Sequence, residues 1–149
     1  MKNFIWIVMT AFMLFGCSKE APTPVSELIK KTWSASSAQW DGTTQYTKGG
    51  SSNLVSGYSQ FKLDLSVAGS VTLTEFDGKQ FTGSYVLASD NTKITLSNLK
   101  SSEGAPTGTS GTLEFRIVGT PTATTLGLET TTTYIKASNK RVSLALVNP

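Results

Sequence analysis

The segment from Tyr58 to Leu87 reads YSQFKLDLSVAGSVTLTEFDGKQFTGSYVL, and its residue pattern decides the fold. Apolar and polar side chains alternate in both halves, and the Asp77-Gly78 pair between them is typical of a hairpin turn. A period of two with one apolar face predicts antiparallel strands that cover a core on one side and face water on the other. The residues expected on the core face are Phe61, Leu63, Leu65, Val67, Val71, Leu73, Phe76, Phe81, Tyr85 and Leu87.

Segments on both sides of this stretch carry similar patterns. Ser26 to Lys31 is predicted to be a brief helix, because Ser26 is a good N-cap and Glu27 lies in the first turn. About eight short strands joined by turns of hairpin length are typical of an all-β sandwich or an antiparallel up-and-down barrel. Outside the central stretch, strands are expected at 32–40, 45–48, 93–99, 112–118, 126–134 and 141–147.

The composition excludes several kinds of chemistry. Among its 149 residues the chain has no histidine and one cysteine, Cys17. Disulfides within the chain, Cys/His zinc sites and every catalytic triad that needs an imidazole base are therefore excluded, and we expect no metal and no cofactor. The net charge is only +3 and no basic stripe with interleaved aromatic residues is present, which argues against nucleic-acid binding.

The first residues read as an export signal. Lys2 supplies a positive charge, and the apolar run that follows is too short to span a bilayer comfortably. The run ends in Leu14-Phe15-Gly16-Cys17, which resembles the bacterial lipobox, with Phe15 bulkier than the usual residue. An ordinary signal peptide with an incidental cysteine, or a short membrane anchor, is the alternative. We expect residues 1–16 to be a lipoprotein signal peptide and Cys17 to be acylated with palmitate-type chains.

The segment after the cysteine is expected to be a tether. Residues 17–25 contain Pro22 and Pro24 and would lift a domain of residues 26–149 off the lipid. Ser18-Lys19-Glu20 partly resembles the charged signals of surface-exposed lipoproteins from Bacteroidota-type bacteria. The expected location is the cell envelope, as an outer-membrane lipoprotein that faces the periplasm or the surface.

The order of elements carries a family resemblance. A brief helix with Leu28 precedes a strand with Trp33, and consecutive hairpins follow, including Phe61–Leu65, the 74–83 turn region and 93–96. This order is similar to the lipocalin-like domains of small bacterial lipoproteins. The resemblance implies an up-and-down barrel that closes around an apolar centre.

The resemblance also implies roles for particular residues. In lipocalins a tryptophan closes the barrel floor and a late arginine often stacks on it; the matching residues are Trp33 and Arg141, while Lys31 stands where the lipocalin motif has glycine. Such a cation–π contact contributes about 0.5–2 kcal/mol, and Trp33 is expected to be buried. An eight-stranded barrel either fills with side chains or holds one small ligand. The residues expected to line such a cavity are Phe61, Phe76, Phe81, Tyr85 and Phe115.

Catalysis is not expected. A glycosidase needs two carboxyl groups at a defined separation, and the candidates are Asp41, Glu75, Asp77 and Glu114. The two aspartates precede glycine and are expected to cap their own turns, and the two glutamates are expected to face solvent.

Two binding hypotheses remain open, both for a monomer anchored in a membrane by its N-terminal lipid. In the first, the barrel holds a small hydrophobic ligand. In the second, the barrel is packed solid and presents loops to an envelope partner or a polysaccharide, with the contact made by Trp40, Tyr46 and the loops 49–52 and 101–110. The volume of the interior distinguishes the two.

Overall fold

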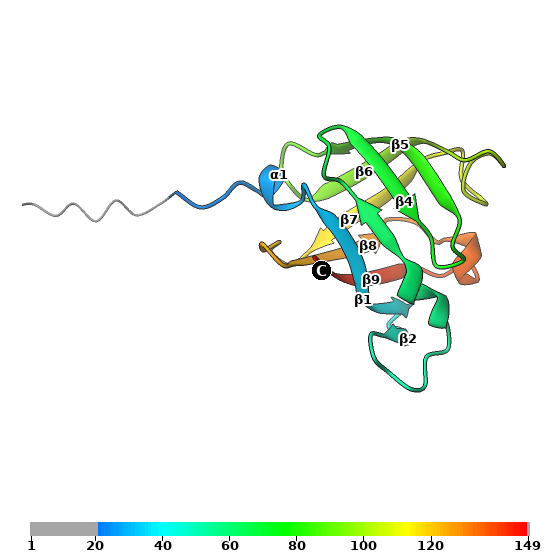
Figure 1. Cartoon of the computed structure of the whole chain (residues 1–149). Coiled ribbons are helices and arrows are strands. Elements are labelled where there is room, and N and C mark those ends of the chain that lie inside the picture. Colours follow the sequence, from blue (N-terminus) through cyan, green and yellow to red (C-terminus); the bar gives the residue numbers. More distant parts are fainter. Residues whose placement is uncertain (1–20, 149) are drawn as a thin grey trace, which may run out of the picture.

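The computed structural model describes residues 21–148 of the protein. This part of the chain contains nine strands, one short α-helix and two 3-10 turns, joined by loops. The structure is mostly strand, with the chain running up and down between neighbours (Figure 1). In chain order the elements are α1 (Val25–Leu28), β1 (Thr32–Trp40), β2 (Thr43–Thr47), η1 (Ser56–Gln60), β3 (Lys62–Asp64), β4 (Ser70–Thr74), β5 (Gln80–Leu87), β6 (Lys93–Lys100), β7 (Leu113–Val118), β8 (Thr125–Thr130), η2 (Ile135–Ala137) and β9 (Val142–Val147).

All strand pairs are antiparallel, and the sheet closes on itself. Strands β3 to β9 pair in sequence, and β9 returns to pair with β1. The first part of β1 pairs with β3, whereas its last part pairs with β2 on the same edge. The barrel therefore has eight strands, and β2 is an additional strand that extends beside it. The expectation of an antiparallel up-and-down barrel is confirmed.

The pairing gives the barrel two distinct ends. We call the end where β1 begins the floor; it carries α1 and the turns at 88–92 and 119–124. We call the other end the mouth; it carries the β4–β5 turn, the β6–β7 loop at 101–112 and the segment 131–141 between β8 and β9. Both ends of the described chain lie at the floor, where the Asn148 side-chain amide donates to the Thr32 carbonyl at 2.9 Å.

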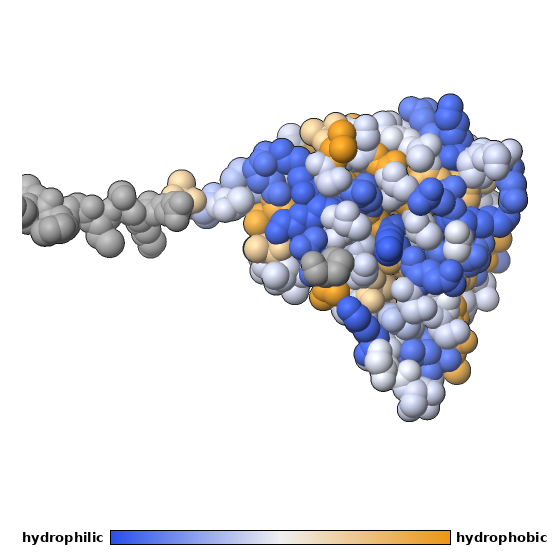
Figure 2. Space-filling view, in the orientation of Figure 1, coloured by the Kyte–Doolittle hydropathy of each residue, from blue (hydrophilic) through white to orange (hydrophobic). Residues whose placement is uncertain are grey.

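The interior of the barrel is apolar and continuous. Side chains from every barrel strand belong to one buried cluster, and Trp33 and Leu63 are completely enclosed. The face in Figure 2 is largely hydrophilic with scattered apolar patches, as expected when the apolar alternation points inward. All eight barrel strands and the core that they enclose lie within residues 21–148.

Three local predictions were wrong. The helix spans Val25–Leu28 with Pro24 at its N-cap, so Ser26 lies inside it and caps nothing. Tyr58 lies in the 3-10 turn η1, because the chain must bend there to pass from β2 into β3. Val67 is 64% exposed, since β3 ends at Asp64 and the alternation no longer applies in the turn that follows.

Candidate functional site at the barrel mouth

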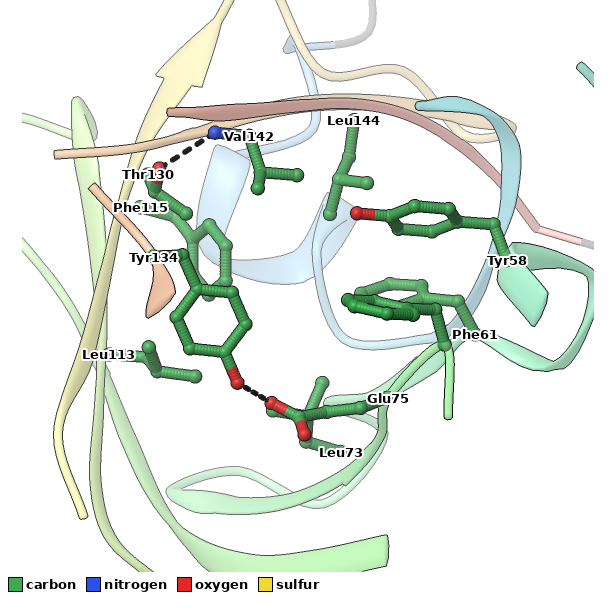
Figure 3. A pocket seen from close by; sticks show the side chains of 11 residues that line it. Tyr58, Phe61, Leu73, Glu75, Leu113, Phe115, Thr130, Tyr134, Val142 and Leu144 are labelled. Carbon is green, nitrogen blue, oxygen red and sulfur yellow. Dashed lines mark hydrogen bonds between the residues drawn. The ribbon is translucent and has the colours of Figure 1, made fainter. Parts of the chain in front are cut away.

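A small cavity lies beneath the mouth. Its volume is about 30 Å³, which is room for one or two water molecules. Its walls come from η1, from the β4–β5 turn and from strands β7 to β9 (Figure 3). The lining residues are mostly aromatic or aliphatic: Tyr58, Phe61, Leu73, Glu75, Phe76, Leu113, Phe115, Thr130, Tyr134, Val142 and Leu144.

An aromatic cluster forms one wall of this cavity. The Tyr58 ring lies 4.8 Å from the Phe76 ring between centroids, and 6.3 Å from the Phe61 ring. The indole N–H of Trp40 donates to the Tyr58 hydroxyl at 2.8 Å. Burial raises the pKa of Tyr58 to about 12, so its hydroxyl stays protonated over the physiological range. This wall is already packed.

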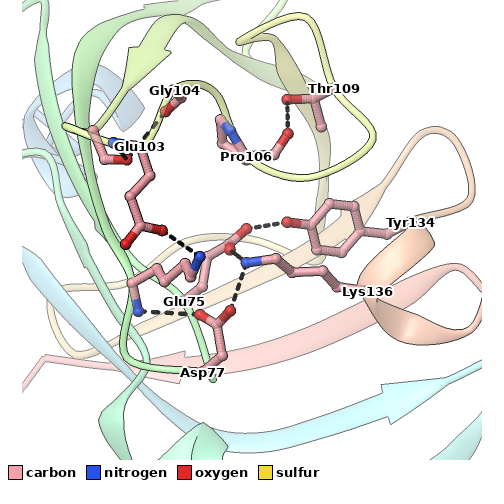
Figure 4. A network of polar contacts seen from close by, with 10 residues as sticks. Glu75, Asp77, Glu103, Gly104, Pro106, Thr109, Tyr134 and Lys136 are labelled. Atoms are coloured by element: carbon pink, nitrogen blue, oxygen red, sulfur yellow. Dashed lines mark hydrogen bonds and ion pairs between the residues drawn. The ribbon is translucent and has the colours of Figure 1, made fainter.

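A buried polar network forms the opposite wall (Figure 4). Glu75 is only 3% exposed, and its carboxylate accepts hydrogen bonds from the Tyr134 hydroxyl and the Lys136 ammonium. The same ammonium donates to Oδ2 of Asp77 at 2.7 Å and lies 5.6 Å from the centroid of the Phe81 ring. Every buried side-chain N or O atom among the described residues has a hydrogen-bond partner, as a stable polar interior requires.

The pKa values follow from this geometry. Burial favours the neutral form of Lys136, but the hydrogen bonds and charges of Asp77 and Glu75 outweigh it, so the pKa of Lys136 is raised. Burial also opposes ionisation of Asp77, and the neighbouring Lys136 overcomes it, so the pKa of Asp77 is lowered. Burial and the Glu75 charge both raise the pKa of Tyr134. Lys136 and Asp77 are therefore charged, and Tyr134 is neutral, at neutral pH.

A polar groove runs along the outside of the mouth. Its volume is about 320 Å³, and it lies between the 101–112 loop and the segment that follows β8. Glu114 is its charged residue, and the ammonium of Lys93 pairs with that carboxylate at 2.9 Å. The remaining walls are rich in hydroxyl groups: Gly108, Thr109, Thr112, Leu113, Thr130, Thr131, Thr132, Thr133 and Tyr134. The groove, unlike the cavity, is large enough to receive a group from outside.

The five residues expected to line a ligand cavity are only partly brought together. Phe61, Phe76 and Phe115 line the 30 Å³ cavity. Phe81 is buried beneath Lys136 instead. The hydroxyl of Tyr85 donates to the Leu65 carbonyl at 3.2 Å, near the floor.

Trp33 and Arg141 do not form the expected pair. Trp33 is fully buried at the floor, as expected, and its indole N–H donates to the Ile29 carbonyl at 2.9 Å. The β1–β9 register places Val142 opposite Trp40, so Arg141 lies at the mouth end of this strand pair. Trp33 belongs to the other end of β1, which separates the two by the length of that strand. The segment before β1, which contains α1 and Ile29, covers Trp33 at the floor. Arg141 does not.

The carboxylates also differ from expectation. Asp77 caps its own turn, with the Lys79 N–H donating to it at 3.0 Å. Asp41 instead accepts from the Arg141 N–H at 2.9 Å and so joins β1 to the start of β9. Glu75, expected to face solvent, is buried because it continues the inward-facing alternation of Val71 and Leu73 one step past the end of β4 at Thr74. Glu114 lies on the outside of the barrel and pairs with Lys93, as noted above.

The sequence analysis missed Tyr134 and Lys136. The threonine run predicted a strand through residue 134, whereas β8 ends at Thr130. Ser138 and Asn139 both adopt positive φ, at 56° and 57°. A Ser-Asn pair before a strand is a turn signal that could have shown that this segment is a loop.

Two further findings apply to residues 21–148. No helix in this range is long and apolar enough to cross a membrane. Likewise, no group of three or more Asp, Glu or Cys side chains in this range is placed to hold a metal ion. Cys17 and the expected signal peptide lie outside the described residues.

Comparisons with known proteins agree with the barrel. The chain is similar to the crystal structure of a lipocalin-like protein from Bacteroides uniformis ATCC 8492, at 16% sequence identity and a TM-score of 0.50, covering 80% of this chain and 96% of that chain. It is also similar to an uncharacterised protein from Bacteroides eggerthii DSM 20697, at 16% identity and a TM-score of 0.47, covering 80% and 98%. No protein-family description and no curated protein matches the sequence significantly. The closed eight-strand barrel and the first of these structures together show that the chain has a lipocalin-like fold.

Proposed function

We propose that this protein is a non-catalytic lipoprotein of the cell envelope whose packed barrel serves as an interaction domain. The observation that carries the proposal is the filled interior. Sites for small molecules usually measure about 300–1,000 Å³, and the interior cavity measures about 30 Å³. In an open barrel the inward-facing side chains line a pocket. In this barrel they fill the interior themselves.

The mouth and the β2 side of the barrel offer the contact surfaces. The 320 Å³ groove is bordered by the 101–112 loop, which contains one of the two loops expected to reach a partner. The other, 49–52, follows β2 and extends beside the barrel (Figure 1). Tyr46 is buried and Trp40 is half-buried, so these two residues support the loops and leave the contact to the loops themselves.

The absence of catalysis is supported by the state of the carboxylates. Glu75 and Asp77 do approach each other, but the Lys136 ammonium lies between them and pairs with both. A glycosidase needs one protonated and one ionised carboxyl group flanking a substrate. Here the space between the two groups is occupied, and neither faces an open cleft.

The anchor is supported by the sequence and by the place where the chain enters the barrel. Acyl chains on Cys17 would each bury many methylene groups at about 0.8 kcal/mol apiece. Residues 21–24 lead into α1 at the floor, so an anchor before them leaves the mouth on the far side of the barrel. Metabolic labelling with palmitate tests this: we expect label on the full chain in cell envelopes and none on Cys17→Ala, and an unlabelled wild type would refute the anchor.

Recovery of partners from envelope extracts tests the interaction role. We expect the barrel to retain a protein or polysaccharide, and a variant with 102–109 replaced by a short glycine linker to lose it. A second variant, in which the loop 49–52 is shortened, is tested in the same assay to show which of the two loops makes the contact. Unchanged recovery with both variants would reject the proposal.

A small hydrophobic ligand is the second candidate, favoured by the aromatic lining of the cavity from Phe61, Phe76 and Phe115. Titration with N-phenyl-1-naphthylamine distinguishes the two candidates. The packed barrel is expected to give no saturable fluorescence increase. Saturable binding at one site per chain would favour the ligand role and overturn the packed one.

A further inference from the structure

Three exposed valines lie at the floor of the barrel. Val67 is 64% exposed, Val86 66% and Val118 46%. Val67 belongs to the turn between β3 and β4, and the other two lie at or next to the floor ends of β5 and β7. In residues 21–148 the other large apolar side chains that are exposed are Leu54, beside β2, and Ile135, at the mouth. Exposed apolar side chains are therefore concentrated at the floor.

Val67 and Val86 lie on neighbouring elements. The Ser70 N–H donates to the Val67 carbonyl at 3.0 Å, which closes the turn that carries Val67. The Tyr85 N–H donates to the Gly69 carbonyl at 3.1 Å, so this turn lies against the end of β5, where Val86 is the next residue. Turn positions usually carry Gly, Pro, Asn, Asp or Ser, and Val67 lies outside the buried core. An apolar turn beside a second exposed valine indicates a surface that contacts something apolar.

The charges at the floor are balanced and held by partners within the chain. Lys30 pairs with Glu27 at 2.6 Å, and the Lys31 ammonium donates to a backbone carbonyl of the 119–124 turn. Asp64 accepts from a backbone N–H of the turn that follows it, at 2.9 Å. These side chains do not form the basic cluster that selects anionic lipid headgroups. Contact with a surface would therefore come from the apolar side chains.

A lipid bilayer is the apolar surface that the proposed anchor brings within reach of the floor. Cys17 stands eight positions before Val25, where α1 begins. Eight residues span at most about 26–29 Å when fully extended. The helix α1 adjoins the turn that carries Val67, because the Leu65 N–H donates to the Lys31 carbonyl at 2.9 Å. Figure 1 shows the chain entering the barrel at this end.

We propose that the floor docks on the lipid bilayer, with Val67 and Val86 inserted at the boundary between headgroups and acyl chains. The proposal rests on the lipid anchor proposed above. The anchor holds the floor close to the bilayer, so a contact too weak to retain a free protein becomes effective. Docking fixes the direction of the barrel, and the groove and loops of the mouth face away from the membrane.

Lipid-chain quenching of a fluorescent dye tests the docking on the full acylated chain in phosphatidylcholine vesicles. Cys17 is the one natural cysteine and has no free thiol once acylated, so a nitrobenzoxadiazole dye attaches only to an engineered cysteine. Ala68→Cys places the dye beside Val67, and Thr107→Cys places it in the mouth loop; both positions are exposed. Lipids with a nitroxide on the acyl chain should reduce the fluorescence at 68 at least about twofold and leave that at 107 unchanged. No quenching at 68, or equal quenching at both positions, would overturn the proposal.

Variants test whether the valines make the contact. Val67→Asp and Val86→Asp, each combined with Ala68→Cys, should lose most of the quenching, because an ionised carboxylate does not enter the acyl-chain region. Leu54→Asp removes an exposed apolar side chain beside β2 and is the matched control, which should be quenched like the parent. Both valines are exposed, so the melting temperatures should stay close to that of the parent. Quenching that persists when both valines are replaced would refute the docking.

A longer tether separates docking from mere proximity. An insertion of eight glycine and serine residues after Thr23 should keep more than about half of the quenching at 68 if apolar contact holds the floor on the bilayer. Complete loss of quenching would show that the short tether alone had brought the dye near the lipid.

The palmitate experiment distinguishes failure of the anchor from failure of the docking. An unlabelled wild type removes both. Labelled protein that binds vesicles without quenching at 68 overturns the docking alone and leaves the anchor in place.

Discussion

The floor and the mouth of the barrel are closed by different means. At the floor, α1 and Ile29 cover Trp33, and the one polar atom of that side chain donates to a backbone carbonyl. At the mouth, the segment 131–141 is held through charged side chains, Glu75, Asp77 and Lys136. Apolar burial and backbone hydrogen bonds involve no titratable group, whereas contacts between charged side chains change with pH and are screened by salt. The floor is therefore a permanent closure, and the mouth is a closure that depends on conditions.

The largest effect should come from breaking the floor. Trp33→Ala removes a fully buried indole and is expected to lower the free energy of unfolding by about 3–5 kcal/mol. Trp40→Ala, at the mouth, removes a half-buried indole and should cost about 1–2 kcal/mol, since less area is lost. Urea denaturation of both variants checks the comparison. Equal losses would show that the two ends are closed alike.

High pH should weaken the mouth selectively. The pKa of Tyr58 is raised to about 12, and that of a tyrosine in the unfolded chain is about 10. The folded state therefore holds this proton more tightly; the associated stability is complete below about pH 10 and is lost as pH rises toward 12. We expect a loss of about 2–3 kcal/mol over this range. The raised pKa values of Tyr134 and Lys136 act in the same direction.

The variant Tyr58→Phe measures how much of that alkaline loss belongs to one residue. It should unfold somewhat more easily at neutral pH, because the Trp40 N–H loses its acceptor. Its free energy of unfolding should then fall less steeply than wild type between pH 10 and 12. If the free energy of unfolding of the variant falls with pH as steeply as that of wild type, residues other than Tyr58 cause the loss of stability at high pH.

A smaller effect is expected from one hydroxyl at the mouth rim. The Thr130 side chain is buried and accepts from the Val142 N–H at 3.0 Å. Thr130→Val keeps the shape and leaves that N–H unpaired, at a cost of about 1–2 kcal/mol. Thr132→Val, an exposed neighbour, is the control and should change stability by less than about 0.5 kcal/mol. Thermal or urea unfolding of the two variants side by side settles the difference.

The smallest effect should come from the exposed ion pair near the mouth. Lys79 and Glu103 approach to 2.5 Å, but their side chains are 50% and 69% exposed. A double-mutant cycle with Lys79→Ala and Glu103→Ala should give no measurable coupling, because solvent screens the pair. A clearly measurable coupling would mean that charges outside the buried network also hold the mouth.

Much of the barrel was predictable because alternation is a local signal. Phe61, Leu63 and Leu65 are buried as their pattern indicated, and β1 has the bounds that the sequence suggested. The mouth was less predictable, because its side chains are positioned by contacts between distant segments. Glu75 and Tyr134 are separated by 59 positions and meet only when the barrel closes. No periodicity within either segment carries that information, and the same holds for the separation of Trp33 from Arg141.

An even number of barrel strands returns the chain to the side from which it started. Asn148 donates to Thr32 at 2.9 Å, so the end of β9 and the start of β1 are neighbours. A short linker can therefore join them, and new termini can be opened in the 101–112 loop to give a circularly permuted protein. A fluorescent reporter attached at this end of β9 would lie on the underside and leave the opposite rim unobstructed for binding assays.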